Sequence, residues 1–208
     1  MSAFQLGLDR SGNANHWNVT GLTQTDRVID TPSNNFSVLN NVYRNTSGGP
    51  TFTEGNLQTV TPNSGAGISL STIGVESGKW YAEVYLVAIT SLQRTVVAIT
   101  GDADGTIEAN TNIGSLTTSL DVGYFFNGTK FVNNSESAST GASYAVGDVM
   151  GIALNVDDSE VTFYKNNSSQ FTQAFTAGGT YHFAHGDASA GGGSTNVFNF
   201  GQDSSFAG

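Results

Sequence analysis

One stretch, residues 144–167, constrains the fold of this chain more than any other. Apolar residues alternate with small or polar ones at positions 152–156, and the alternation resumes at positions 161–163. Side chains of a β-strand point alternately to its two faces, so each run gives a strand with one apolar face. The Asp-Asp-Ser sequence at 157–159 favours a turn, because short Asp side chains bond to their own backbone and tolerate left-handed angles. The stretch predicts a β-hairpin, whose apolar face needs a second sheet to cover it.

The remaining chain also has the pattern of short strands separated by turns. The apolar run 96–100 indicates a central strand, and residues 120–126 and 130–132 flank Asn127-Gly128, a strong signal for a tight hairpin turn. Weaker alternation over residues 50–76 and aromatic-rich segments near the C-terminus add further strands. No stretch shows convincing helical periodicity. The sequence therefore predicts an all-β chain.

Three motifs, in order, resemble the SPRY domain family. Gly147-Asp148-Val149 with the hairpin that follows resembles the core hairpin of SPRY domains, residues 77–84 (Ser-Gly-Lys-Trp-Tyr-Ala-Glu-Val) resemble an early strand, and residues 199–202 (Asn-Phe-Gly-Gln) the closing strand. The resemblance covers roughly residues 50–206 and implies a two-sheet antiparallel sandwich of SPRY or concanavalin-like jelly-roll type. It also implies that Trp80 lies in the core, where we place Leu154 and Phe163 as well. We divide the chain into an N-terminal arm, residues 1–49, and a SPRY-like β-sandwich, residues 50–208.

Composition excludes several functional classes. The formal net charge of −10 repels phosphate backbones and anionic membrane surfaces, so we expect neither nucleic-acid nor membrane binding. The chain has no cysteine, which excludes a disulfide framework and thiol chemistry. No apolar segment approaches the ~20 residues needed to cross a bilayer, and no secretory signal is visible at the N-terminus. We therefore expect synthesis in a cytoplasm and release without export.

The arm carries a second resemblance. Residues 9–17 are turn-rich with one large aromatic, and residues 30–36 contain Thr-Pro-Ser-Asn-Asn-Phe. Both resemble segments of phage and marine-virus structural proteins that precede a SPRY-like domain. Two interpretations stay open. The arm docks on a neighbouring protein, or it folds onto its own sandwich with Trp17 and Phe36 filling grooves.

The best metal candidate is the carboxylate pair Asp102 and Asp104, followed by Glu108. Carboxylates two residues apart in a loop can share calcium, but Ala and Asn stand at the later ligand positions, so we interpret the segment as an Asx-rich turn. His182 and His185 are three residues apart and would face opposite sides of a strand, so they do not share a metal. We expect no metal and no cofactor.

The sequence also lacks the motifs of an active site. It contains no nucleophile elbow, no zinc-protease motif and no phosphate-binding loop. Glu83 and Asp148 could be imagined as a glycosidase pair, but both belong to the scaffold motifs of the SPRY resemblance. We predict no catalytic residues and no enzyme activity.

Binding residues favour loops held by a rigid scaffold. We place such loops at residues 91–94, 102–112, 133–143 and 185–194, and the candidate binding residues on them are Arg94, Asp102, Asp104 and His185. The planar guanidinium of Arg94 can pair with a carboxylate or stack on an aromatic ring of a ligand. It could equally neutralise acidic residues of its own chain, of which there are 17 against 7 basic ones.

The leading functional hypothesis is a non-enzymatic phage virion structural protein, made in the host cytoplasm. It would decorate the particle, or form part of a tail fibre or spike for host attachment. Its partners would be other virion proteins, through the arm, and a glycan or protein of the host surface, with the chain present as a homo-oligomer or in many copies. Two alternatives remain: a lectin-like carbohydrate-binding module and a peptide-binding SPRY adaptor.

Overall fold

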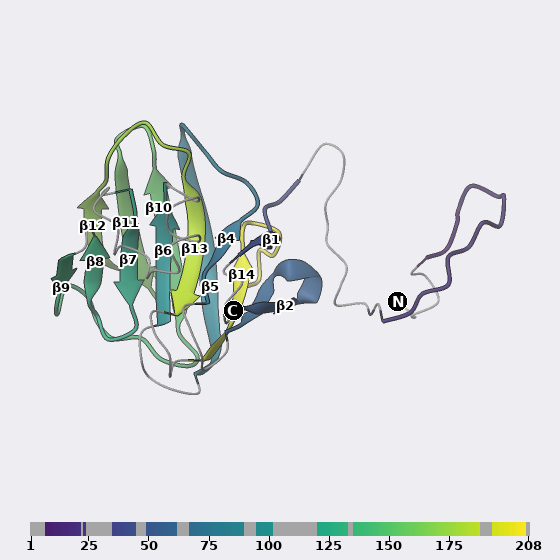
Figure 1. Cartoon of the computed structure of the whole chain (residues 1–208), viewed down its shortest axis with the longest axis horizontal. Coiled ribbons are helices and arrows are strands. Elements are labelled where there is room, and N and C mark those ends of the chain that lie inside the picture. The colour runs from purple at the N-terminus through teal and green to yellow at the C-terminus, as the bar shows by residue number, and fades with distance from the viewer. Residues whose placement is uncertain are drawn as a thin grey trace.

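The structure is a computed structural model that describes residues 7–21, 23, 35–44, 49–61, 67–89, 95–101, 120–132, 135–187 and 193–206. Within these residues the chain is all-β, with fourteen strands and one short 3-10 helix, η3 (Glu54–Asn56). No helix of the described residues has the length and apolar character to span a membrane. The strands form two antiparallel sheets that pack face to face, which confirms the predicted sandwich (Figure 1).

Each sheet has seven strands. The first sheet has the order β1 (Leu39–Arg44), β4 (Ser69–Ser71), β13 (His182–Asp187), β6 (Thr95–Thr100), β7 (Val122–Phe125), β8 (Lys130–Val132), β9 (Ser135–Ser137). The second sheet has the order β12 (Ser168–Ala174), β11 (Glu160–Lys165), β10 (Val149–Asn155), β5 (Lys79–Ile89), β14 (Ser194–Asn199), β3 (Gln58–Val60), β2 (Thr51–Thr53).

The predicted central hairpin is confirmed as β10 and β11. Ile152 pairs with Phe163 and Leu154 with Val161, so the apolar residues of both strands share one face. All four side chains are at most 1% exposed. Ser159 in the connecting turn has a φ of 55°, the left-handed geometry that the Asp-Asp-Ser sequence suggested. The apolar face packs against the first sheet, where the rings of Phe163 and Tyr124 lie 5.7 Å apart in an edge-to-face arrangement.

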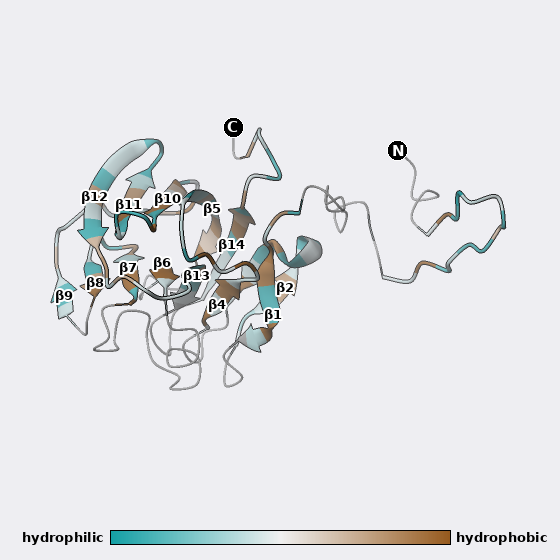
Figure 2. Ribbon diagram, turned by 90° about the horizontal axis from the view of Figure 1, so that it is seen from above, coloured by the Kyte–Doolittle hydropathy of each residue, from teal (hydrophilic) through white to brown (hydrophobic). Residues whose placement is uncertain are grey.

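The core occupies the space between the sheets, and Figure 2 shows apolar stretches on the strands that enclose it. Leu154 and Phe163 belong to this core, as predicted. The prediction for Trp80 is wrong, because its side chain is 46% exposed. Trp80 pairs with Leu154 and continues the alternation of buried Ala82 and Val84, but it lies at the beginning of β5, where the sandwich opens into a pocket.

The tight turn predicted at Asn127-Gly128 is also confirmed. It joins β7 to β8, with Gly128 N–H donating to Phe125 O (3.0 Å) and Phe125 N–H to Thr129 O (2.8 Å). The Asn127 side-chain oxygen accepts from Thr129 N–H at 3.1 Å, and Gly128 has a φ of 86° that other residues rarely adopt.

Part of the predicted arm belongs to the sandwich. β1 pairs with β4 and contributes Leu39, which is fully buried, so the sandwich begins before the boundary placed at residue 49. Residues 7–21 form a separate turn-rich loop (Figure 1). Its side chains are mostly exposed, that of Trp17 to 81%.

Candidate binding site

Of the four predicted recognition residues, the structure describes one, His185. Arg94, Asp102 and Asp104 lie outside the described residues. His185 was placed in a surface loop, but it lies in β13 and its side chain is fully buried between the sheets. A further predicted loop is partly a strand, since residues 135–137 form β9.

His185 is buried because its partners come from the opposite sheet. Its Nε2 accepts from Asn196 Nδ2 of β14 at 2.8 Å, and the same amide donates to Ser194 Oγ at 2.8 Å. Ser194 Oγ lies 3.1 Å from Thr61 Oγ1, so a chain of polar contacts crosses the interior. Burial lowers the pKa of His185 to about 3, which leaves the ring neutral. We call these four residues the polar layer; no sequence pattern near His185 reveals it, because Asn196 reaches the ring from the other sheet.

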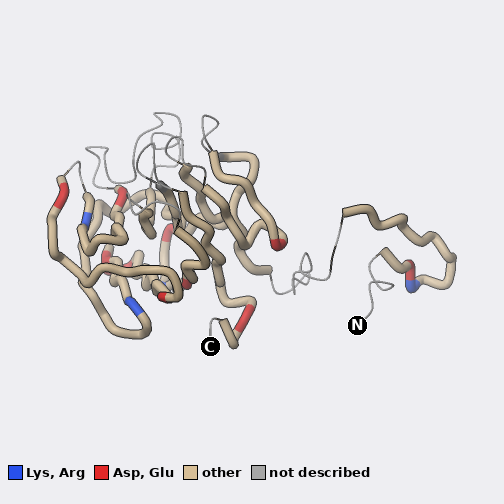
Figure 3. The backbone as a smooth tube through the Cα atoms, turned by 90° about the horizontal axis from the view of Figure 1, so that it is seen from below, with Lys and Arg blue, Asp and Glu red and all other residues tan. Residues whose placement is uncertain are grey.

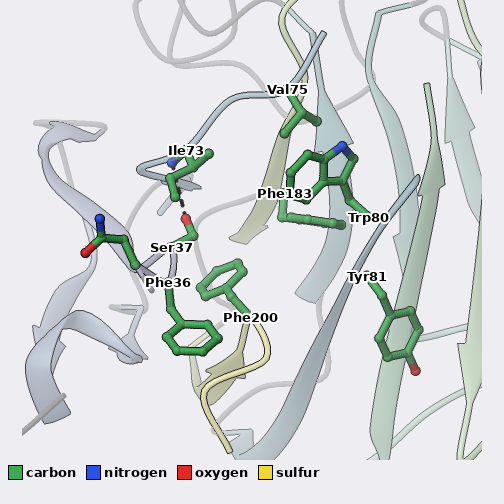
Figure 4. Close-up of a pocket in the computed structure, with 9 residues that line it drawn as sticks. Phe36, Ser37, Ile73, Val75, Trp80, Tyr81, Phe183 and Phe200 are labelled. Atoms are coloured by element: carbon green, nitrogen blue, oxygen red, sulfur yellow. Dashed lines mark hydrogen bonds between the residues drawn. The ribbon is translucent and has the colours of Figure 1, made fainter. Parts of the chain in front are cut away.

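One concave feature of the described surface is a pocket of about 230 Å³. It is lined by Asn35, Phe36, Ser37, Ile73, Val75, Trp80, Tyr81, Phe183 and Phe200 (Figure 4). We call it the Trp80 pocket. It brings together Phe36 of the predicted arm, Trp80 of the predicted core and Phe200 of the predicted closing strand.

A turn before β5 positions the indole of Trp80. Gly78 has a φ of 88°, and its N–H donates to Asp157 Oδ1 at 2.7 Å, so the Asp-Asp-Ser turn of the central hairpin holds this second turn. Trp80 Nε1–H donates to Ser77 O at 2.7 Å. A Cβ atom at Gly78 would lie 3.3 Å from the indole nitrogen, so the ring packs directly over the glycine. The indole N–H of Trp80 is thus hydrogen-bonded within its own turn, and the ring lines the pocket.

The opposite wall comes from segments near the two ends of the sandwich. Ser37 Oγ accepts from Ile73 N–H at 3.2 Å, and Val38 O accepts from Thr72 N–H at 2.7 Å, which fixes the segment that carries Phe36 (Figure 4). Phe36 packs near Gly201, and Phe200 lies 6.1 Å from Phe183 between ring centroids. Phe36 therefore folds onto its own sandwich, one of the two alternatives for the arm, whereas Trp17 does not fill a groove.

The chemistry of the Trp80 pocket is apolar and neutral. No residue that lines it is an Asp, Glu, Lys or Arg, and charged residues are sparse along the described chain (Figure 3). The phenol of Tyr81 turns away from the ring of Phe183 (Figure 4); burial, together with nearby Glu83, raises the pKa of Tyr81 to about 12, so it stays protonated. Such a site can hold a bulky apolar group by burial and ring contacts.

The two carboxylates considered as a catalytic pair serve the scaffold. Glu83 accepts from Asn199 Nδ2 at 3.1 Å, and Asp148 lies 3.1 Å from Lys165 Nζ. Burial alone would raise the pKa of Asp148, but hydrogen bonds from Ala145 N–H, Asn166 and Lys165 hold it below its usual value. Within the described ranges, no three His, Asp or Glu side chains gather to hold a metal ion.

The comparisons with known proteins agree with this architecture. A family profile described as SPRY domain matches residues 85–203. No curated protein matches the chain. Among solved structures, the SPRY domain of human HERC1 superposes with a TM-score of 0.61 at 19% identity, covering 74% of this chain and 94% of that one.

Two further structures show the same fold. The TRIM65 PSpry domain gives a TM-score of 0.59 at 13% identity, covering 79% of this chain and 90% of that one. Stonustoxin gives 0.60 at 16% identity, covering 79% of this chain but 27% of the toxin chain. At these identities the likeness concerns the fold of the sandwich.

Proposed function

The chain belongs to the SPRY domain family, whose β-sandwich typically mediates protein–protein interaction, and from this premise we propose that it is a non-enzymatic module that binds a bulky apolar side chain of a partner protein in the Trp80 pocket. One observation carries the proposal: an indole 46% exposed forms a wall of an apolar pocket of about 230 Å³. Tryptophan is enriched at the energetic centres of protein interfaces, because it buries a large area at little cost in conformational entropy.

The test uses two matched variants of the full chain. Ile73 lines the pocket and is 42% exposed, whereas Val146 is 55% exposed and lies outside the pocket lining. Ile73→Asp and Val146→Asp each put a carboxylate at an exposed apolar position, so both proteins should fold. N-acetyl-tryptophan amide serves as the probe, and its binding is followed by NMR at the Trp80 Nε1–H and at the amides of Gly78 and Gly201.

We expect the probe to shift these signals in the wild type and in Val146→Asp, and to leave them unmoved in Ile73→Asp. Equal shifts in Ile73→Asp, or shifts confined to other amides, would contradict the pocket as the binding site.

For the biological setting, we propose a virion structural protein of a phage, decorating the particle or forming part of a tail fibre or spike. The support is the resemblance of residues 9–17 and 30–36 to segments of viral structural proteins, and a chain with no cysteine and few charges. A mass-spectrometric inventory of purified particles tests it, since a cellular adaptor would be absent from them.

Host attachment remains part of this proposal through Arg94, Asp102 and Asp104, for which the sequence predicts exposed loops. Replacing these three residues by alanine should abolish adsorption and leave the melting temperature unchanged. Adsorption that survives all three changes would favour decoration over attachment. Binding on a glycan array would favour the lectin-like alternative.

A further inference from the structure

Residues 7–19 form a loop that is ordered by its own polar groups and presents apolar side chains outward. Trp17 N–H donates to Gly7 O at 2.9 Å, and the Asp9 carboxylate accepts from Ser11 N–H at 2.7 Å and from Asn15 N–H at 3.0 Å. On this frame Trp17 is 81% exposed, Leu8 43% and Val19 36%. We call this segment the Trp17 loop. Because its backbone is already bonded, docking of Trp17 would cost little ordering entropy.

We propose that the Trp17 loop of one copy of this chain docks in the Trp80 pocket of a second copy, so that the chain forms a dimer by exchanging its N-terminal loops. The inference rests on the proposed function of the pocket and names its partner.

Size supports this occupant. An apolar cavity of about 150 Å³ accommodates benzene. A ring system half as large again, such as indole, therefore needs roughly the 230 Å³ that the Trp80 pocket provides. The pocket wall offers the rings of Phe36, Phe183 and Phe200, on which a further aromatic ring can stack or pack edge-on.

Connectivity supports an exchange between copies. Asn35, Phe36 and Ser37 line the pocket, so the N-terminal chain leaves the sandwich at the pocket rim. Residues 18–34 can span at most roughly 60 Å when extended. Two copies with their pockets facing across a two-fold axis can thus each give a loop to the other. Such a reciprocal contact closes on itself and does not grow into a filament.

The net charge of −10 on each copy predicts a specific salt response. The pocket lining and the side chains of Leu8, Trp17 and Val19 carry no formal charge, and the opposite charges of Asp9 and Arg10 in the loop cancel, so the contact itself depends little on screening. The copies repel one another as wholes, and salt screens that repulsion. Dimerisation should therefore strengthen as salt is raised, unlike an association held by ion pairs.

The experiment measures the mass of the full chain by light scattering over a range of concentrations. We expect a concentration-dependent dimer for the wild type, and monomers for Trp17→Ser and for Ile73→Asp. Val42→Ser is the matched control, because Val42 is 95% exposed on β1 and belongs to neither surface, so its dimer should persist. A mixture of Trp17→Ser with Ile73→Asp should restore a weaker dimer, since one copy still has the pocket and the other the loop.

The remaining outcomes distinguish a failure of the loop exchange from a failure of the proposed function of the pocket. A wild type that stays monomeric while Ile73→Asp abolishes binding of N-acetyl-tryptophan amide overturns the exchange but leaves the proposed function of the pocket intact. A Trp17→Ser dimer as tight as the wild type also overturns the exchange. A probe that fails to bind in the wild type, at dilutions where the chain is monomeric, removes the proposed function as well.

Discussion

Two residues of this sandwich have a burial opposite to what their side-chain polarity suggests. His185, a titratable group, is fully buried in the polar layer, and Trp80, a large apolar group, is 46% exposed. Their environments have different consequences: burial of His185 links its protonation to the stability of the fold, whereas the exposed ring of Trp80 forms part of the pocket that we propose as a binding site. Both consequences can be measured by substitution.

His185 should make stability depend on pH. Its pKa is about 3 in the folded protein and near 6.5 when unfolded, so the unfolded state binds the extra proton as the pH falls between these values. The contribution of neutral His185 to the unfolding free energy should be fully present above the pKa of the unfolded state. It should decrease as the pH falls towards the pKa of the folded state, by on the order of 1 kcal/mol per pH unit. Urea unfolding across this range measures it. His185→Gln should show a shallower dependence, and equal slopes for the two proteins would contradict a buried neutral ring.

Trp80 should contribute less to stability than its size suggests. Leu154→Ala removes a side chain 1% exposed and should cost ~2–5 kcal/mol, the range for buried leucines. Trp80→Ala removes a half-exposed ring and should cost roughly half of the ~3–5 kcal/mol of a buried tryptophan. Chemical denaturation compares the two variants. If Trp80→Ala proved the more damaging, Trp80 would be a core residue after all.

At the scale of elements, turns fix the strands beside them. The Asp-Asp-Ser turn of the central hairpin also holds Gly78 through Asp157, and Gly128 closes the β7–β8 hairpin.

Two glycines allow the cost of backbone geometry to be separated from the cost of a clash. Gly128 (φ 86°) and Gly147 (φ 92°) have similar backbones, but only at Gly128 would a Cβ meet another group, the carbonyl of Gly141.

Gly147→Ala should therefore cost about 1–2 kcal/mol, the penalty of a left-handed angle for a residue with a Cβ. Gly128→Ala should cost more, because the Thr140 and Gly141 amides that donate to Gly128 O must move with the clash. Thermal or urea unfolding of both variants decides. Equal decreases in unfolding free energy would show that the segment around Gly141 can move away from the added Cβ at little cost.

The same scale explains what the sequence could predict. The β10–β11 hairpin and the Asn127-Gly128 turn follow from patterns a few residues long, and both are confirmed. The Trp80 pocket could not be predicted in this way, because Phe36 and Phe200 reach Trp80 only after the sheets have assembled. His185 was misplaced for the same reason, since its polarity suggested a loop and its partner Asn196 belongs to the other sheet.

For the whole molecule, the boundary between arm and sandwich has a direct test. Deleting residues 1–34 should leave the unfolding free energy nearly unchanged, because every strand that the structure describes and every residue that lines the Trp80 pocket is retained. Deleting residues 1–45 also removes β1 and buried Leu39, and should destabilise the protein by several kcal/mol. Denaturant titration measures both. Equal stability of the two truncated proteins would place β1 outside the folded unit.

The Trp80 pocket joins Phe36, near the start of the sandwich, to Phe200 on the segment after its last strand. During synthesis the ribosome makes one wall before nearly all of the sandwich exists and the other after it. Contacts between such distant positions form late, since the loop between them must close first. A chain that has not yet reached Phe200 therefore lacks one wall of the pocket, so under the proposed function only a folded chain that includes residue 200 can bind at this site.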